Sequence, residues 1–151
     1  MTGQQVAKRG ALVAALCAGA FAASVAPAAA DQPAFVSIGV VHTLGDACYG
    51  QGQAGISAPT GAPGTTRFGI SFVKYTPTFG QPCTFKALAN WRNLDTGATG
   101  TVTVPVTDSS SSNQAPPTVF ADLPTGPGRV QVSVTTDRLH LPVPTVEIRI
   151  P

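Results

Sequence analysis

The chain has 151 residues, of which 43% are hydrophobic and 11% are charged, and its formal net charge at pH 7 is +2. Lys8 and Arg9 account for this excess, because nine basic residues less these two leave seven, equal to the seven acidic ones. The other basic residues are scattered along the sequence. This argues against a nucleic-acid partner, whose phosphates require clustered Lys and Arg.

Residues 1–30 have the three parts of a secretory signal peptide. Two basic residues precede an apolar run at 11–25, and small alanines at 28–30 provide the cleavage position. The run of about 15 residues is shorter than the roughly 20 that a membrane helix needs. We therefore expect the signal to be removed, leaving a single domain at residues 31–151 with no membrane span. Its expected location is secreted and extracellular, either free or associated with the cell envelope.

Two cysteines, Cys48 and Cys83, remain after the signal. In an oxidising exported compartment an even pair is most simply a disulfide, and two free thiols are the alternative. Closing a loop of about 36 residues in this way contributes at most roughly 4 kcal/mol in the chain-entropy treatment. We therefore predict a Cys48–Cys83 bridge.

The pattern of the mature sequence is that of short strands, with alternating apolar and polar residues and frequent Gly and Pro. No stretch keeps apolar residues at the spacing of three to four that a helix needs. The predicted strands are 35–43, 67–75, 83–92, 101–107, 118–123, 129–135 and 145–150. The stretch 48–56 is a less clear candidate.

The strand at 83–92 shows the alternation well, with one face expected in the core and the other in solvent. The core face carries Cys83, Phe85, Ala87, Ala89 and Trp91. In the next strand Pro105 cannot donate to a ladder, so that strand should be an edge or should bend there. A tight hairpin is expected at 95–97 with Gly97 left-handed, and another reversal at 124–128.

About seven short strands, each with one apolar face, predict an all-β fold of two sheets packed face to face. Phe120, Leu123-Pro124 and Gly126, followed by the alternating strand at 129–135, resemble the E-to-F region of immunoglobulin-like and fibronectin-type domains. The resemblance implies an immunoglobulin-like β-sandwich. The cysteines depart from it, because immunoglobulin domains bridge strands B and F with a Trp between the two positions, whereas Trp91 follows both cysteines.

The sequence shows no catalytic, cofactor or metal site. His42 and His140 have no second His or Cys at metal-ligand spacing. Ser57 is not in a G-x-S-x-G elbow. The glycines at 50–55 match G-x-G-x-x-G in position, but no helix-forming segment follows them, so a phosphate-binding loop is not expected. We therefore expect a non-catalytic protein without a cofactor.

Aromatic residues near turns are the remaining candidates for binding. Tyr49, Tyr75 and Phe79 lie near turns, with Phe79 in a Pro-containing loop just before Cys83, and an aromatic ring held in such a loop could stack on a sugar or anchor a protein. The alternative is that Phe79 folds back over the end of the sandwich. We take Tyr75 and Phe79 as the candidate partner-binding residues.

The sequence therefore predicts a secreted, non-catalytic immunoglobulin-like module with a binding or structural role toward an unknown protein or glycan outside the cell. An alternative is a small exported protease or glycosidase inhibitor that presents the loop at 58–66 or at 76–82, since a rigid loop loses little entropy on binding. A third interpretation, a carrier of hydrophobic ligands, requires an apolar pocket between the sheets.

Overall fold

The computed structural model describes residues 35–46, 48–75, 82–108 and 116–151. The expected signal peptide and Phe79 lie outside these ranges. The described part contains eight strands and no helix, which confirms the all-β prediction. The strands are β1 (Phe35–Leu44), β2 (Tyr49–Ser57), β3 (Thr66–Lys74), β4 (Thr84–Asn93), β5 (Thr99–Thr107), β6 (Val119–Leu123), β7 (Gly128–Thr136) and β8 (Val146–Ile150).

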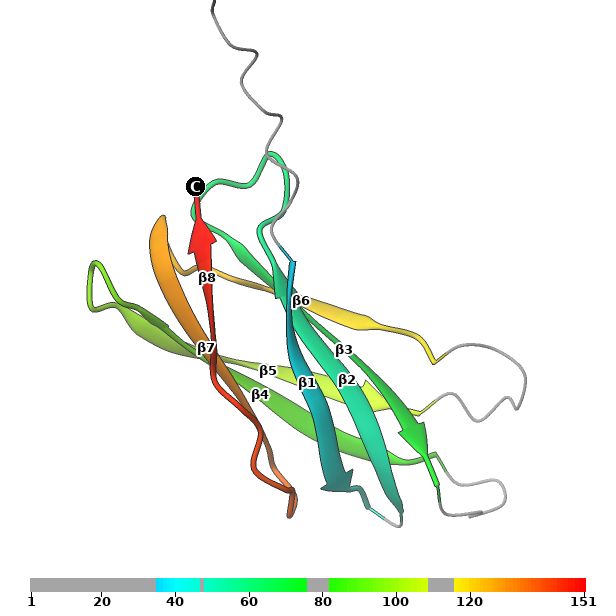
Figure 1. Cartoon of the computed structure of the whole chain (residues 1–151). Helices are drawn as coiled ribbons and strands as arrows, with labels where there is room; N and C mark the ends of the chain where they lie inside the picture. Colours follow the sequence, from blue (N-terminus) through cyan, green and yellow to red (C-terminus); the bar gives the residue numbers. More distant parts are fainter. Residues whose placement is uncertain (1–34, 47, 76–81, 109–115) are drawn as a thin grey trace, which may run out of the picture. The chain divides into compact units, whose positions relative to one another are not determined.

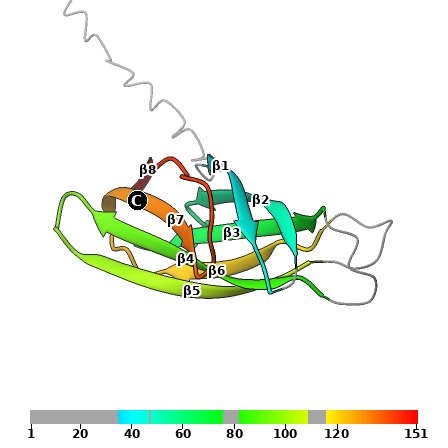
Figure 2. The ribbon, with the colours of Figure 1, turned by 90° about the horizontal axis from the view of Figure 1, so that it is seen from below.

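The strands form two antiparallel sheets of four (Figure 1). Sheet 1 has the order β1-β2-β3-β6, and sheet 2 has the order β5-β4-β7-β8. Figure 2 shows the two layers, with β1, β2 and β3 on one side and β4 and β5 on the other. The predicted two-sheet sandwich is confirmed. In the part of the chain described, no helix is long and apolar enough to cross a membrane.

The strand that the sequence marks least clearly, β2, lies in the middle of sheet 1, paired with β1 and β3 along nearly its whole length. Two of its inward positions are glycines because atoms of β3 lie close against them. A Cβ atom on Gly50 would overlap with the carbonyl oxygen of Val73 and lie 2.5 Å from Cζ of Phe72, and one on Gly52 would lie 2.8 Å from the carbonyl oxygen of Ser71. The glycines at 50–55 therefore form an extended strand and not a phosphate-binding turn.

Strand β1 contains a bulge at Gly39. Ser37 pairs with Gly55, but Gly39 pairs with Ala54, so β1 has one extra residue at this point. Gly39 has φ +113°, a conformation that L side chains rarely adopt, which explains the glycine. The bulge shifts the alternation of β1, so that Ile38 and Val41, three residues apart, both point into the core.

Apolar side chains from both sheets fill the space between the layers. Phe72 of β3 and Phe85 of β4 meet edge to face, with ring centroids 4.8 Å apart and an angle of 67° between the planes. The predicted core row of β4 is confirmed, because Cys83, Phe85, Ala87 and Ala89 are at most 4% exposed. Trp91 is only partly buried; it packs against the core at its border.

The placement of Trp91 is explained by Gly100 on the neighbouring strand β5. A Cβ atom at Gly100 would lie 2.6 Å from the indole ring, so the glycine provides room for the ring to lie across β5. Strand β5 is an edge of sheet 2, as Pro105 predicts. Gly97 in the β4–β5 hairpin has φ +79°, which confirms the predicted left-handed turn.

A buried side chain links two turns at one end of the sandwich. Asn93 is fully buried, and its Nδ2 donates to the carbonyl oxygens of Thr125 and Pro127, both at 2.9 Å. Its Oδ1 accepts from the backbone N–H groups of Asp95 and Thr96 at 2.9 and 3.0 Å. Asn93 thus satisfies its own amide while joining the β4–β5 hairpin to the β6–β7 connection.

Candidate functional site

The predicted disulfide is present. Cys48 immediately precedes β2, and Cys83 immediately precedes β4. Cys48 and Cys83 are bonded with their Cα atoms 5.7 Å apart, within the usual range for a bridge. Both residues are buried. Gly45 lies against the bond, since a Cβ atom there would lie 2.7 Å from Sγ of Cys83 and would also contact Sγ of Cys48. The bridge joins sheet 1 to sheet 2 beside the β1–β2 turn.

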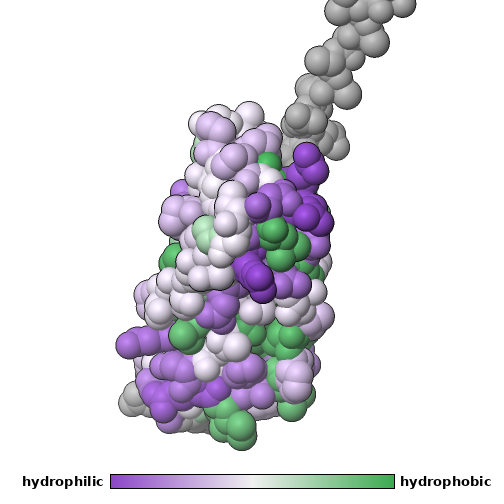
Figure 3. All heavy atoms as spheres, turned by 90° about the vertical axis from the view of Figure 1, so that its left-hand side faces the viewer, coloured by the Kyte–Doolittle hydropathy of each residue, from purple (hydrophilic) through white to green (hydrophobic). Residues whose placement is uncertain are grey.

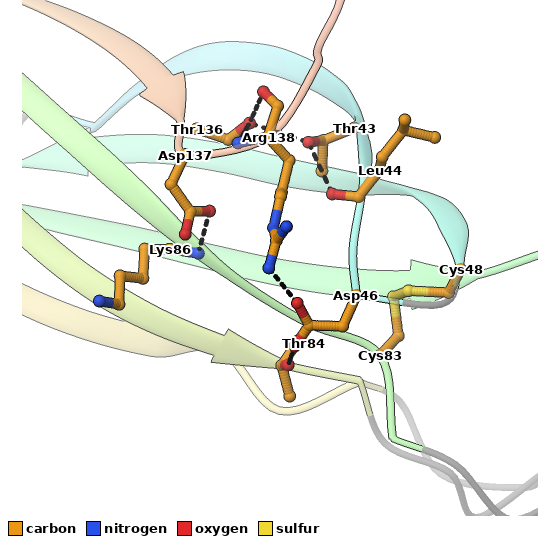
Figure 4. Close-up of polar contacts among 10 residues, drawn as sticks. All are labelled: Thr43, Leu44, Asp46, Cys48, Cys83, Thr84, Lys86, Thr136, Asp137 and Arg138. Atoms are coloured by element: carbon orange, nitrogen blue, oxygen red, sulfur yellow. Dashed lines mark hydrogen bonds and ion pairs between the residues drawn. A yellow bond between two sulfur atoms is a disulfide. The ribbon is translucent and has the colours of Figure 1, made fainter.

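Polar contacts around the disulfide fasten the chain after β7 to both sheets (Figure 4). Asp46 accepts a hydrogen bond from Thr84 at 2.5 Å and pairs with the guanidinium of Arg138. On the other side, the hydroxyls of Thr43 and Thr136 lie 2.9 Å apart. These contacts hold β1, β4 and the end of β7 together at this end of the sandwich.

The segment after β7 extends sheet 1 beyond β1. The backbone N–H of Leu44 donates to the carbonyl of Leu139, and that of Leu141 donates to the carbonyl of His42, both at 3.0 Å. Thr43 and His140 form an antiparallel bridge between these bonds. Residues directly opposite in an antiparallel pair share a face. Leu139 and Leu141 therefore lie on the same face of sheet 1 as Leu44 and His42.

A buried ion pair lies close to the disulfide. Asp108, after β5, is 6% exposed; its Oδ1 accepts from the backbone N–H of Cys83 at 2.6 Å. Its Oδ2 lies 3.2 Å from Nζ of Lys74 at the end of β3. The Asp108 carboxylate thus bonds the N–H of Cys83 next to sheet 2 and pairs with Lys74 of sheet 1, so its role is structural.

The outer face of sheet 1 carries the large exposed hydrophobic side chains. The described residues include nine such side chains, and by strand register all nine lie on this face or on its extension at Leu139 and Leu141. They are Phe35, Val40, Leu44, Tyr49, Val73, Tyr75, Phe120, Leu139 and Leu141. The face is therefore chemically distinct.

The outer face of sheet 2 is polar. Its strands present threonines from β5 and the exposed charged side chains Lys86, Arg92, Arg129, Glu147 and Arg149. Figure 3 shows the side of the molecule on which β7 and β8 lie in Figure 1, and there the hydrophobic residues form patches interrupted by polar ones. The contrast between the two outer faces, one hydrophobic and one polar, identifies the outer face of sheet 1 as the candidate interaction surface.

One end of this face, which we call the tyrosine end, lies near the disulfide. The backbone N–H of Tyr75 donates to the carbonyl of Tyr49 at 2.8 Å, and their ring centroids are 5.8 Å apart. Tyr49 also stacks on His42, with its hydroxyl 3.4 Å from Nδ1. The tyrosine end comprises Leu44, Tyr49, Val73, Tyr75, Leu139 and Leu141.

Tyr75 is 51% exposed directly after β3, and its role in binding a partner stays a prediction. Its proposed companion Phe79 is outside the described residues. Sequence analysis missed most of the tyrosine end because it is assembled from β1, β2, β3 and a segment after β7. The alternation in each segment identifies an outward face, but only the strand order brings these faces together.

The other end of the face has a hollow of about 370 Å³, which we call the phenylalanine hollow. Gly55 of β2 and Gly69 of β3 face each other in its floor. A Cβ atom at Gly55 would lie 2.8 Å from the ring of Phe35, and one at Gly69 would lie 2.9 Å from the ring of Phe120. Two rings from the edge strands thus cover glycines of the central strands.

The charged groups at this hollow neutralise each other. Nε of Arg67 donates to Oδ1 of Asp122 at 2.8 Å, and Nη2 donates to Oδ2 at 3.2 Å. These hydrogen bonds lower the pKa of Asp122 and raise that of Arg67, and the attraction between the two charges acts in the same direction. The pair is exposed, so it contributes geometry and local neutrality more than stability.

Ser57 and His42, which the sequence offered for chemistry, lie at opposite ends of the β1–β2 pair, whereas His42 and His140 lie on paired segments. Nδ1 of His140 lies 2.9 Å from the carbonyl oxygen of Leu141, which can only accept a hydrogen bond. The serines at 109–112 lie outside the described residues. Within the described ranges, no group of three or more His, Cys, Asp or Glu side chains is arranged to hold a metal ion.

The loop proposed for inhibition at 58–66 is fastened to the end of the sandwich. The N–H of Gly64 donates to the carbonyl of Pro151 at 3.2 Å, and the N–H of Gly126 donates to the carbonyl of Gly64 at 2.8 Å. Its exposed side chains, such as those of Thr60 and Pro63, are small. It has no large side chain of the kind that anchors most tight interfaces.

Fold and surface together define a two-sheet β-sandwich with one exposed aromatic and aliphatic face. Comparison with protein-family models, with curated proteins and with solved structures gives no match.

Proposed function

We propose that this chain is an exported, non-catalytic β-sandwich module that binds a partner through the outer face of sheet 1. The observation that carries the proposal is the segregation of the nine exposed large hydrophobic side chains onto that face. Exposed apolar side chains gathered on one face mark interaction sites more than hydrophobic residues scattered singly over the surface do. The polar outer face of sheet 2 provides the contrast within the same molecule.

The order of the strands supports an immunoglobulin-like arrangement within this proposal. Strands β2, β3 and β6 would correspond to A, B and E, and strands β5, β4, β7 and β8 to C′, C, F and G, with β1 as an added strand beside A. Trp91 then lies on strand C, which is where immunoglobulin domains carry their Trp. The Cys48–Cys83 bridge keeps the departure noted in the sequence, since it does not join B to F.

The roles of the acidic side chains support a non-catalytic function. Each aspartate in the described residues bonds a backbone N–H, a hydroxyl or a basic side chain that secures a turn or a strand. The side chain of Asp137, for example, accepts a hydrogen bond from the backbone N–H of Lys86 at 2.8 Å. The backbone N–H of Asp137 donates to the carbonyl of Lys86 at 3.0 Å. These carboxylates serve the fold.

Export is supported by the signal sequence and by the disulfide, because bridges of this kind form and persist in oxidising compartments. The proposed location is therefore outside the cytoplasm, either in the medium or at the cell envelope. The proposed partner is a protein or a glycan met there.

The experiment compares matched substitutions on the two faces. Val73→Glu places a charge on the outer face of sheet 1, and Thr103→Glu places the same charge on the outer face of sheet 2. The exported proteins are immobilised and exposed to culture medium and envelope extract, and the retained proteins and glycans are identified. We expect wild type and Thr103→Glu to retain the same component and Val73→Glu to lose it. Equal retention by all three, or none by any, would contradict the proposal.

A further inference from the structure

The phenylalanine hollow combines two exposed aromatic rings with a floor that is bare of side chains. Phe35 and Phe120 are 70% and 63% exposed, although each ring rests on a glycine of the neighbouring strand. Packing of an aromatic ring over a cross-strand glycine accounts for the contact of each ring with the sheet. It does not explain why both rings border the same hollow of about 370 Å³.

The rings are held in place before any ligand arrives. Contact with Gly55 and Gly69 fixes one side of each ring, and the exposed side remains available. A flat apolar surface that is already positioned loses little conformational entropy when a second flat surface stacks on it. The hollow is within the range of volumes in which proteins bind small molecules, at its smaller end.

Around the rings the hollow is polar but uncharged overall. Its lining includes hydroxyl and amide side chains that can both donate and accept hydrogen bonds: Ser37, Gln53, Ser57, Ser71 and Thr118. Among the described residues that line the hollow, the one cation is Arg67, which Asp122 holds through two hydrogen bonds. A ligand that fits should therefore be neutral, with an apolar face for the rings and hydroxyls for the rim.

A sugar ring has this combination of surfaces. We propose that the phenylalanine hollow binds a neutral hexose or pentose unit of an extracellular glycan, stacked on Phe35 or Phe120 with its hydroxyls bonded to the surrounding serines and to Gln53. The proposal rests on the proposed function, because it names the ligand class for one end of the same face. The tyrosine end is separate, and Val73 there is not part of the hollow.

The test is a titration of the isotopically labelled exported protein, followed by amide chemical shifts. The probes are maltohexaose, cellohexaose, xylohexaose and chitohexaose, each raised to about 10 mM, above the weakest specific dissociation constants of about 1 mM. We expect at least one of them to shift the amides of Gly55, Gly69 and Gln53. The shifts should leave the outer face of sheet 2 unaffected.

Two substitutions separate stacking from folding. Phe35→Leu and Phe120→Leu keep an apolar cover over the glycines but remove the flat ring, so each should fold and the one under the sugar should weaken binding about tenfold or more. Phe→Tyr at the same position should restore binding. Val73→Glu should bind the sugar like wild type, which keeps this test distinct from that of the proposed function.

The outcomes distinguish failure of this inference from failure of the proposed function. No shift with any of the four sugars would overturn the inference, while loss of the captured partner in Val73→Glu would still uphold the proposed function. Shifts at the hollow caused by an extended proline-rich peptide and by none of the sugars would overturn the inference in favour of a peptide ligand. Sugar binding with no effect of either Leu substitution would also contradict it, because the rings would not be the contact.

Discussion

Lys74 and Asp108 form an ion pair of 3.2 Å that joins the end of β3 in sheet 1 to the end of β5 in sheet 2. Asp108 also accepts from the buried N–H of Cys83. Substituting Asp108→Ala should lower the free energy of unfolding by about 2 to 4 kcal/mol, because a buried donor and a cation lose their acceptor together. Urea unfolding monitored by the fluorescence of Trp91 measures the change.

The exposed pair Arg67–Asp122 provides the control for that prediction. Asp122→Ala removes an Asp–Arg pair whose side chains are about half exposed, so it should change stability little. Asp108→Asn keeps an acceptor for Cys83 and should be less harmful than Asp108→Ala. If Asp108→Ala and Asp122→Ala had equal effects, the structural role assigned to Asp108 would be wrong.

The disulfide should be complete in protein recovered from an oxidising compartment. Denatured, unreduced protein should take up no maleimide, and reduction should expose two thiols at Cys48 and Cys83. A Cys48→Ala, Cys83→Ala variant should lose at most about 4 kcal/mol of stability, because the bridge mainly restricts the unfolded chain. Its circular dichroism should stay strand-like, since the alternating core rows specify the sheets. Two labelled thiols before reduction would refute the bridge.

The stability penalty of a larger residue at position 45 should depend on the disulfide. Gly45→Ala places a Cβ atom against both sulfur atoms, so the bond or the β1–β2 turn must shift, at a cost of about 1 to 3 kcal/mol. In the Cys48→Ala, Cys83→Ala background the sulfur atoms are absent, and the penalty should shrink. A double-mutant cycle on unfolding free energies measures this coupling. An unchanged penalty would show that the sulfur atoms do not restrict the position.

Acid should weaken the fastening of the β4–β5 hairpin to β7. The backbone N–H of Arg129 donates to the Asp95 carboxylate at 2.8 Å, and Nε of the same residue donates to it at 2.9 Å. These hydrogen bonds hold the pKa of Asp95 below its usual range. A lowered pKa in the folded state means that the pair contributes fully above about pH 4, the unfolded value, and that this contribution is lost as the pH falls further.

The measurement for this pH dependence is the carboxyl chemical shift of Asp95 across an acid titration, with unfolding followed in parallel. Asp95→Asn should lose the part of the acid dependence that arises from this residue, while Asp122 continues to titrate below its usual range. A normal midpoint for Asp95 would contradict the assignment.

Much of the fold follows from local pattern. The period-two rows at 83–92 and 129–135 and the turn glycine Gly97 are each determined by residues close in sequence. β2 is less clear in the sequence because two of its inward residues, Gly50 and Gly52, are explained only by the close approach of the adjacent strand β3.

The candidate binding face could not be predicted in the same way. Phe35 and Phe120 are 85 residues apart in the sequence, and they border one hollow only because the strands of sheet 1 have the order β1-β2-β3-β6. A signal for it was present, since a glycine inside a strand such as Gly69 often marks the close approach of another group. Asp108 and Asp95 likewise bond backbone N–H groups far away in sequence, which no local pattern indicates.

The bulge at Gly39 divides the outer face of sheet 1 into two regions that face in different directions. A bulge bends its strand and increases the local right-handed twist, and Gly39 lies between the Phe35 end and the Leu44 end of β1. The phenylalanine hollow and the tyrosine end therefore do not share one flat plane. A stiff, straight polymer cannot lie flush against both, whereas a branched or flexible chain, or two different molecules, can occupy them at the same time.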